Sequence, residues 1–261
     1  MKRLILLILV SLLTVIAMVT GCRGGVVRGS GDLETEVFSY QDFTRVDIGH
    51  AFEVEIIQSD TYSISITADD NLFEYIEVLK DGDILEIGLE PVITLWSSTL
   101  RAEITMPELR GIYISGATRG TVEGFSSPDN LDINVSGASS IDLVDITAGD
   151  ASCEVSGASR AIGILYSADA DFEVSGASNI QLEGSANDLT ANVSGASRAN
   201  LGAFLVDNAD ISFSGASSGT IAINPDGVLD VDLSGASRLN YIGEPVMGRI
   251  SISGASSINQ K

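Results

Sequence analysis

Hydrophobic and polar residues alternate with a period of two at regularly repeated places in the second half of the chain. Each place has an apolar residue, a mostly polar residue and another apolar residue, and Ser-Gly-Ala follows directly. This alternation is typical of a β-strand with one buried face, and it excludes a helical repeat. The apolar residues just before the Ser-Gly-Ala segments are Ile114, Val135, Val155, Val174, Val193, Phe213, Leu233 and Ile252.

The tetrapeptide that follows these strands sets the length of the repeat. It is SGAT once and SGAS afterwards, and neighbouring copies lie 19 to 21 residues apart. A period of about 20 residues predicts a solenoid with two or three short strands per coil, and the leucine and asparagine ladder of leucine-rich repeats is missing. The glycine permits a backbone bend, while alanine and serine fit where coils crowd. The copies begin at Ser115, Ser136, Ser156, Ser175, Ser194, Ser214, Ser234 and Ser253.

The sequence therefore predicts an all-β fold, a single-domain parallel β-helix, in which residues 111–261 hold the SGAS repeats. Residues 38–110 also show alternating strand patterns, with bulkier side chains but without SGAS. A solenoid needs a distinct terminal unit that covers the end of its core. We therefore expect irregular opening coils over 38–110, continuous with the repeats.

The N-terminus has the pattern of an export signal. Lys2 and Arg3 precede an uncharged run of 16 residues from Leu4 to Val19. This run is shorter than the roughly 20 residues that span a bilayer, which disfavours an uncleaved anchor. The segment Val19-Thr20-Gly21-Cys22 resembles a bacterial lipobox, in which cleavage occurs before the cysteine and the cysteine is acylated.

Three predictions follow from the lipobox. Residues 1–21 form a lipoprotein signal peptide, Cys22 carries the lipid that anchors the protein in a membrane, and 22–37 form a flexible tether. In envelope lipoproteins that the segment resembles, an aspartate after the cysteine favours the inner membrane, but Arg23 stands here. We expect an exported protein of the cell envelope, either in the outer membrane or on the outer face of the cell membrane.

The charge of the chain limits its partners. The chain has 14 basic and 36 acidic residues, and loss of Lys2 and Arg3 with the leader leaves 12 basic residues and a net charge of −24. Such a charge argues against nucleic acid and anionic lipid as partners. Once Cys22 is acylated, only Cys153 remains, so no intramolecular disulfide can form. Cys153 lies in the inward apolar column, and we expect a core residue.

Several motifs together resemble one bacterial family. They are the lipobox, the Phe-x-x-Val-x-Ile-Gly pattern at 43–49, the segment Ile-Thr-Met-Pro-x-Leu at 104–109, and Ile-Ser-Gly-Ala at 114–117 followed by SGAS repeats. Over residues 38–261 the chain is similar to the family described as "putative auto-transporter adhesin, head GIN domain". The resemblance implies a right-handed parallel β-helix in secreted or envelope-anchored proteins. It supplies no catalytic residues.

Acidic residues are candidates for catalysis, because polysaccharide lyases and hydrolases also have parallel β-helix folds. Asp142, Glu154 and Glu173 are the candidates, and stacking would place Glu154 about 4.8 Å from Glu173, a spacing that resembles a glycosidase pair. Outward carboxylates in a solenoid are more often a charged sheet face. We therefore expect no catalytic residue.

A metal or cofactor site is not expected either. The glycine-rich nonapeptide of calcium-binding β-rolls is absent, and aspartates in turns usually cap backbone N–H groups. His50 is the single histidine, without a second histidine or a cysteine nearby in the sequence, and is expected at a surface or strand end. The turn aspartates that calcium could use are Asp129, Asp150, Asp169, Asp207 and Asp226.

Arginine follows the tetrapeptide in every second repeat, and a small polar residue follows it in the others. Stacked coils would turn these residues into a column of guanidinium groups about 9.6 Å apart. The arginines either offset neighbouring carboxylates or form a docking strip for a repeating anionic polymer, such as an acidic glycan or a teichoic-acid-like chain. The residues of this column are Arg119, Ser140, Arg160, Asn179, Arg198, Ser218, Arg238 and Ser257.

These features together predict a lipid-anchored β-helix that acts as a structural, adhesive or ligand-binding surface module without catalysis, with a cell-surface partner or an anionic surface polymer. The alternative is a carbohydrate-binding or carbohydrate-active β-helix. Sugar sites stack rings on exposed tryptophan or tyrosine, and aromatic residues are few within the repeats, which disfavours that alternative. The last SGAS lies shortly before Lys261. We therefore expect the backbone edge of the final coil either to self-associate or to be protected from self-association by Gln260 and Lys261.

Overall fold

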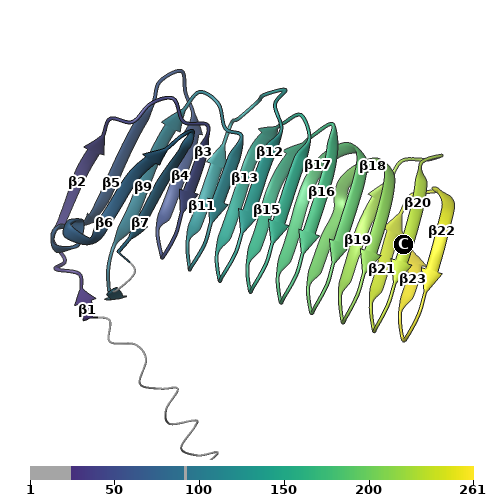
Figure 1. Cartoon of the computed structure of the whole chain (residues 1–261). Coiled ribbons are helices and arrows are strands. Elements are labelled where there is room, and N and C mark those ends of the chain that lie inside the picture. The colour runs from purple at the N-terminus through teal and green to yellow at the C-terminus, as the bar shows by residue number, and fades with distance from the viewer. Residues whose placement is uncertain (1–24, 91–92) are drawn as a thin grey trace, which may run out of the picture.

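The computed structural model describes residues 25–90 and 93–261, so the predicted signal peptide and Cys22 lie outside the described residues. The chain forms one elongated parallel β-helix whose coils follow one another from β10 toward the C-terminal end (Figure 1). The predicted all-β solenoid with coils of about 20 residues is confirmed. In the described ranges, no helix is long and apolar enough to cross a bilayer.

Each coil of the repeat region contributes one strand before the tetrapeptide turn and one strand after it. We call these two ladders the pre-turn stack and the post-turn stack. The pre-turn stack comprises β10 (Gly111–Ile114), β12 (Leu131–Val135), β14 (Ala151–Val155), β16 (Asp169–Val174), the second halves of β17 (Asn179–Val193) and β18 (Arg198–Phe213), β20 (Val228–Leu233) and β22 (Val246–Ile252). The post-turn stack comprises β11 (Arg119–Glu123), β13 (Ser140–Thr147), β15 (Arg160–Tyr166), the first halves of β17 and β18, β19 (Ser218–Ile223), β21 (Arg238–Ile242) and β23 (Ser257–Gln260).

The tetrapeptide turns stack directly on one another, which explains their composition. Gly176 has a φ of +77°, and a Cβ on it would lie 2.4 Å from the carbonyl oxygen of Gly157 in the preceding coil. That oxygen accepts a hydrogen bond from the backbone N–H of Ala177 at 2.8 Å. The last serine of the motif is buried: the Oγ of Ser178 accepts from the N–H of Ser159 at 3.3 Å. Only glycine permits both this φ and this approach.

Inward side chains from both stacks form one continuous apolar core along the rod. Large rings contribute to it, and the ring centroids of Phe172 and Phe204 lie 5.5 Å apart. Cys153 is buried in this core, as predicted, and burial raises the pKa of its thiol to about 12. A thiol with such a pKa stays neutral and packs as a small apolar residue.

The opening coils predicted over 38–110 do not follow one another in chain order. The first coil in the sequence, β3 (Arg45–Ile48) with β4 (Glu53–Gln58), lies between two others. On one side it pairs with β10 and β11, and on the other with β7 (Ile84–Leu89) and β9 (Leu100–Met106). In chain order, β3 and β4 therefore form the first coil, β7 and β9 then lie on one side of it, and β10 and β11 continue the rod on its other side.

Antiparallel strands complete this end of the rod. They take the place of further parallel coils. The short 3-10 helix η1 (Asp70–Tyr75) contributes the buried Leu72. The expected terminal unit that covers the core is therefore built from antiparallel strands. Its antiparallel pairs are β2 (Leu33–Phe38) with β5 (Ser63–Asp69), β5 with β9, and β6 (Ile76–Asp81) with β7.

Two strands lie where a flexible tether was expected over 22–37. β1 (Gly25–Arg28) pairs with β8 (Ile93–Trp96), and β2 pairs with β5. The side chains of β2 are almost all exposed, so its residues Leu33 and Val37 do not belong to a buried face. Backbone pairing with a neighbouring strand, which composition does not reveal, gives this segment its structure.

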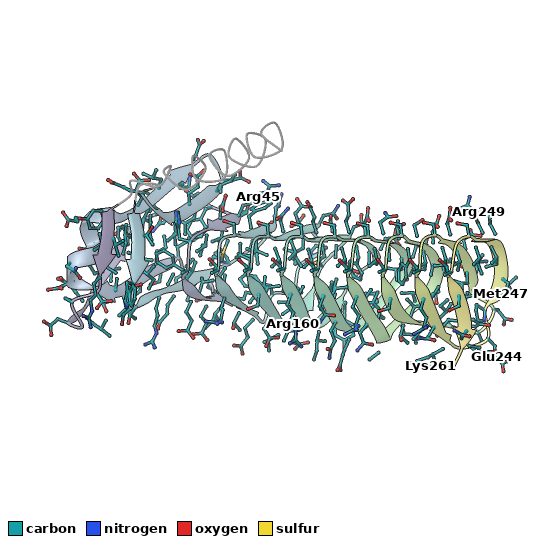
Figure 2. All side chains as sticks on the ribbon, turned by 90° about the horizontal axis from the view of Figure 1, so that it is seen from below. Arg45, Arg160, Glu244, Met247, Arg249 and Lys261 are labelled. Carbon is teal, nitrogen blue, oxygen red and sulfur yellow. The ribbon has the colours of Figure 1, made fainter. Side chains whose placement is uncertain are left out.

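At the opposite end, the last strands are β22 and β23, with apolar residues of β22 open to water (Figures 1 and 2). Val246 is 55% and Met247 43% exposed, although the corresponding residues of β20 are better covered. The expected self-association through this edge remains a prediction.

Candidate functional site

The arginine column predicted from the sequence exists as a ladder in the post-turn stack. Arg119 is the register partner of Ser140, Ser140 of Arg160, and the alternation continues to the last coil. Each of these residues follows the buried final residue of the turn and points outward, because its strand neighbours are inward core residues. Figure 2 shows Arg160 on one long side of the rod and Arg249 on the opposite side. The remaining pairs are Arg160 with Asn179, Asn179 with Arg198, Arg198 with Ser218, Ser218 with Arg238, and Arg238 with Ser257.

Arg119, Arg160, Arg198 and Arg238 form no ion pair with a carboxylate of residues 25–90 or 93–261. Among the residues that the structure describes, every ion pair within 4.0 Å involves a different arginine. This arrangement disfavours the interpretation that the column merely offsets neighbouring acids. Four guanidinium groups thus remain available to an external anion on a strongly acidic protein. The paired arginines are Arg45, Arg101, Arg110 and Arg249.

A second outward column runs beside the arginines, two residues further along each strand. Toward the capped end it is acidic, with Glu103, Glu55 and Asp142 in it. Toward the other end it has only neutral side chains. The neutral part is Gln181, Asn200, Thr220, Asn240 and Asn259 in successive coils.

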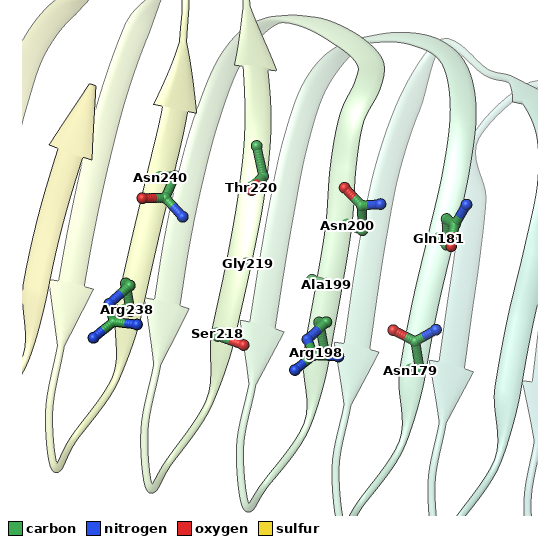
Figure 3. A pocket seen from close by; sticks show the side chains of 10 residues that line it. All are labelled: Asn179, Gln181, Arg198, Ala199, Asn200, Ser218, Gly219, Thr220, Arg238 and Asn240. Atoms are coloured by element: carbon green, nitrogen blue, oxygen red, sulfur yellow. The ribbon is translucent and has the colours of Figure 1, made fainter. Parts of the chain in front are cut away.

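The two columns enclose a hollow of about 410 Å³ in the C-terminal half of the post-turn stack. It forms because Ser218 and Thr220 have short side chains, whereas the coils on both sides carry arginine and asparagine at the same positions. Figure 3 shows Arg198 and Arg238 on the two sides of Ser218, with the amide-bearing side chains in a parallel row. The lining is Asn179, Gln181, Arg198, Ala199, Asn200, Ser218, Gly219, Thr220, Arg238 and Asn240.

The pre-turn stack presents a different outward surface. Glu154 and Glu173 are register partners there, as expected, and the carboxylate of Glu154 accepts a hydrogen bond from Asn134 Nδ2 at 2.8 Å. Asp142, the third catalytic candidate, lies on the post-turn stack. The three acids are therefore not brought together. In the same outward column, burial and the neighbouring Glu86 raise the pKa of Asp47.

The turn aspartates hold backbone and side-chain groups of neighbouring coils. Asp169 Oδ1 accepts from the N–H of Asp188 at 3.2 Å, and Asp188 Oδ1 accepts from Asn208 Nδ2 at 2.7 Å. Asp129 accepts from Ser127 Oγ. Within 25–90 and 93–261, no three His, Cys, Asp or Glu side chains are arranged to hold a metal ion.

His50 occupies a position that the sequence analysis missed. Ile48-Gly49-His50-Ala51-Phe52 aligns in register with Ile-Ser-Gly-Ala-Thr at 114–118, so it is a degenerate copy of the tetrapeptide turn. His50 takes the place of the turn glycine, with a φ of +73°. Its Nδ1 accepts a hydrogen bond from the N–H of Leu89 at 3.2 Å. The signal that could have found it is the apolar residue before the turn and the alanine within it.

This degenerate coil also extends the arginine column. Glu53 is the register partner of Arg119 and forms an ion pair with Arg101 at 3.2 Å. The column therefore begins with the paired Arg101 and Glu53, next to Arg119, and becomes free of acids toward Arg238. Its electrostatic character changes along the rod.

The fold and its outward polar columns define a parallel β-helix with an extended surface strip. The chain belongs to the family described as "Putative auto-transporter adhesin, head GIN domain", whose model matches residues 42–245. The family resemblance noted from the motifs is confirmed. No curated protein sequence matches the chain.

Solved structures share the fold. A "Putative lipid binding protein" from Parabacteroides distasonis is 19% identical, with a TM-score of 0.83 over 91% of this chain and 100% of that one. A "putative adhesin" from Parabacteroides merdae is 17% identical, with a TM-score of 0.77 over 90% of this chain and 99% of that one. A "putative adhesin" from Parabacteroides distasonis is 18% identical, with a TM-score of 0.81 over 91% and 100%. At these identities the likeness concerns the fold.

Proposed function

We propose that this protein is an exported, lipid-anchored and non-catalytic surface module that binds an extended anionic polymer along its arginine column. The observation that carries the proposal is the ladder of four outward arginines without a carboxylate partner in the described residues, on a chain with a net charge of −22. The adhesin description of the family supports a role at the cell surface. The acidic remainder of the surface repels polyanions, so the column is the place where one can bind.

The geometry suits a repeating ligand. Arginines two coils apart are separated by about 9.6 Å, since parallel strands are spaced by about 4.8 Å. Guanidinium groups bind carboxylate, sulfate and phosphate groups in a planar, two-pronged way. Contacts repeated along one polymer act together, and their total affinity exceeds that of any single contact. Because the groups are exposed, the binding is weakened by salt.

The test is binding of the mature chain to immobilised acidic polysaccharides and polyphosphate at low and physiological salt. Replacement of the four column arginines together by glutamine should reduce the affinity on the order of 100-fold or more. The matched control removes four positive charges elsewhere, with Arg28, Lys80, Arg110 and Arg249 replaced by glutamine. An equal loss in the control, or no polyanion binding by the parent at low salt, would contradict the proposal.

Anchoring needs its own experiment, because the proposal places the strip on a membrane-bound protein. Cys22→Ser should release the chain from membranes or block its processing, since the acyl groups provide the membrane affinity. Fractionation of cells that express the parent and the variant measures this. A processed variant that still sediments with membranes like the parent would show that the anchor is elsewhere.

A carbohydrate-active protein is the alternative, and the stacked Glu154 and Glu173 are the observation that favours it. A glycosidase would release reducing ends from a polysaccharide and would lose this activity in Glu154→Gln and Glu173→Gln. Under the non-catalytic proposal, the parent releases none and both variants bind polymer as the parent does.

A further inference from the structure

The three intervals between the column arginines are not equivalent. Between Arg119 and Arg160 lies Ser140, but Asp142 is directly beside it on the same strand face. Glu53 is the register partner of Arg119 on its other side. An anion bound in this interval would lie near the carboxylates of Asp142 and Glu53, which repel it.

The middle interval is free of carboxylates in both columns, and the hollow reaches only part of it. Asn179 lies between Arg160 and Arg198, with Gln181 beside it, and both line the hollow at one end. Ile162 takes the second-column position next to Arg160 and offers no hydrogen bond there. Neither Arg160 nor Ile162 lines the hollow.

In the interval from Arg198 to Arg238, every residue of the two columns lines the hollow. Ser218 and Thr220 leave the hollow of about 410 Å³ open, and the neighbouring coils supply Asn200 and Asn240 at its sides (Figure 3). Neither column has a carboxylate here. Because Ser218 is short, the flexible side chains of Arg198 and Arg238 can both reach the space above it and bind one anionic group.

The neutral residues narrow the chemistry of the ligand. Each asparagine has both a donor and an acceptor, and Thr220 has a hydroxyl that can do either. A polyphosphate chain provides only acceptors, so it can pair with the amide N–H groups but not with the amide oxygens. A sugar ring provides hydroxyl groups that both donate and accept. The lining therefore favours a ligand that combines an anionic group with hydroxyls.

We infer that the hollow between Arg198 and Arg238 seats a uronate unit of an acidic polysaccharide. The two guanidinium groups bind its carboxylate, and Asn200, Thr220 and Asn240 bind its hydroxyls. This inference rests on the proposed function and assigns the ligand class and the seat within the column. The remaining arginines attract the polymer without holding a unit.

Two pairs of matched variants test the location on polygalacturonate. Arg198→Gln with Arg238→Gln should weaken binding by about 30-fold or more, whereas Arg119→Gln with Arg160→Gln should weaken it by about 3-fold or less. Ser218→Gln should fill the hollow and weaken binding by about 10-fold without any change of charge. Ser140→Gln, the same substitution in the acidic interval, should have no such effect. Strand-rich circular dichroism and an unchanged melting temperature verify that each variant is folded.

Three probes test the ligand class: polygalacturonate, polyphosphate and uncharged dextran. The parent should bind polygalacturonate most tightly, and Asn200→Ala with Asn240→Ala should weaken that binding while leaving polyphosphate binding unchanged. If polyphosphate binds equally well, the glycan assignment is overturned. If the two arginine pairs matter equally, the seat is overturned although the column still binds polymer. If the parent binds neither anionic polymer, the proposed function itself fails.

Discussion

The two stacks of the rod have the same kind of inward residues and different outward ones. Inward, both place apolar side chains in register and share one core. Outward, the C-terminal half of the post-turn stack has arginines and a neutral column, whereas the pre-turn stack has stacked acids such as Glu154 on Glu173 and Glu86 on Asp47. The inward pattern is fixed by packing, so the outward positions are free to carry charge of either sign.

The spacing of like charges also differs between the stacks. Arginines recur in every second coil, about 9.6 Å apart, where repulsion in water is about 0.4 kcal/mol per pair. The stacked acids lie in adjacent coils, about 4.8 Å apart, where it is about 0.9 kcal/mol. The column from Arg119 to Arg238 thus keeps its arginines apart, and the hollow at Ser218 lies between two of them.

The largest effect is expected from the turn that joins the two stacks. Gly176→Ala should destabilise the rod by more than about 3 kcal/mol, because the new Cβ would lie 2.4 Å from a backbone oxygen that cannot move aside. Gly124→Ala is the control. Gly124 has a similar φ of +79° but open space around it, so only the strain of about 1 kcal/mol is expected. Denaturant midpoints measured by circular dichroism compare the two, and equal shifts would contradict the stacking argument.

The second-largest effect is expected when the post-turn stack is made acidic, like the pre-turn stack. Asn200→Asp together with Asn240→Asp places two carboxylates beside the hollow and should reduce polygalacturonate affinity about 10-fold or more at low salt. Asn134→Asp with Asn192→Asp adds the same charge to the pre-turn stack and should change affinity less than about 3-fold. Titrations at two salt concentrations distinguish them. Similar losses in both variants would mean that net charge, and not the face, governs binding.

The smallest effect concerns like charges in the pre-turn stack. The pKa of Asp47 is raised in the folded protein by burial and by Glu86, so its ionised form destabilises the fold at neutral pH. Asp47→Asn should therefore be more stable there, on the order of a few tenths of a kcal/mol since water screens the pair. This gain should disappear as pH falls through the raised pKa toward the ordinary 3.8, where the parent is protonated too.

The control for Asp47→Asn is Asp232→Asn, because the register partners of Asp232 are the uncharged Ser212 and Ser251. Denaturation curves at several pH values measure both variants. A gain in Asp47→Asn that persists unchanged at acidic pH would show that removal of the charge is not its cause.

Much of the post-turn stack could be predicted from the sequence. The regular period of 19 to 21 residues determines which residues stack. The sequence alone therefore assigns Arg119, Arg160, Arg198 and Arg238 to one column. The hollow could not be predicted in the same way. It depends on the second column and on the lengths of neighbouring side chains at Ser218 and Thr220, which become a shape only when the coils are side by side.

The opening region shows the limit of pattern analysis. The alternation over 38–110 identified strands, but not that β3 and β4 lie between β7 with β9 and β10 with β11. Alternation records which side of a strand is buried and carries no information on the direction or identity of its neighbour. The degenerate turn at His50 was hidden for a related reason, since only register shows that it stands where a glycine stands in every later coil.

The sequence by itself determined the fold class, the coil length, the inward column that includes Cys153 and the outward arginine ladder, because each follows from local period and repetition. The tertiary structure alone decided the order of the first coils, the antiparallel cap, the absence of carboxylate partners for the column arginines in the described residues, and the open interval between Arg198 and Arg238. These depend on contacts between residues far apart in the chain. Such contacts are set by the free energy of the whole packed molecule, which no local pattern contains.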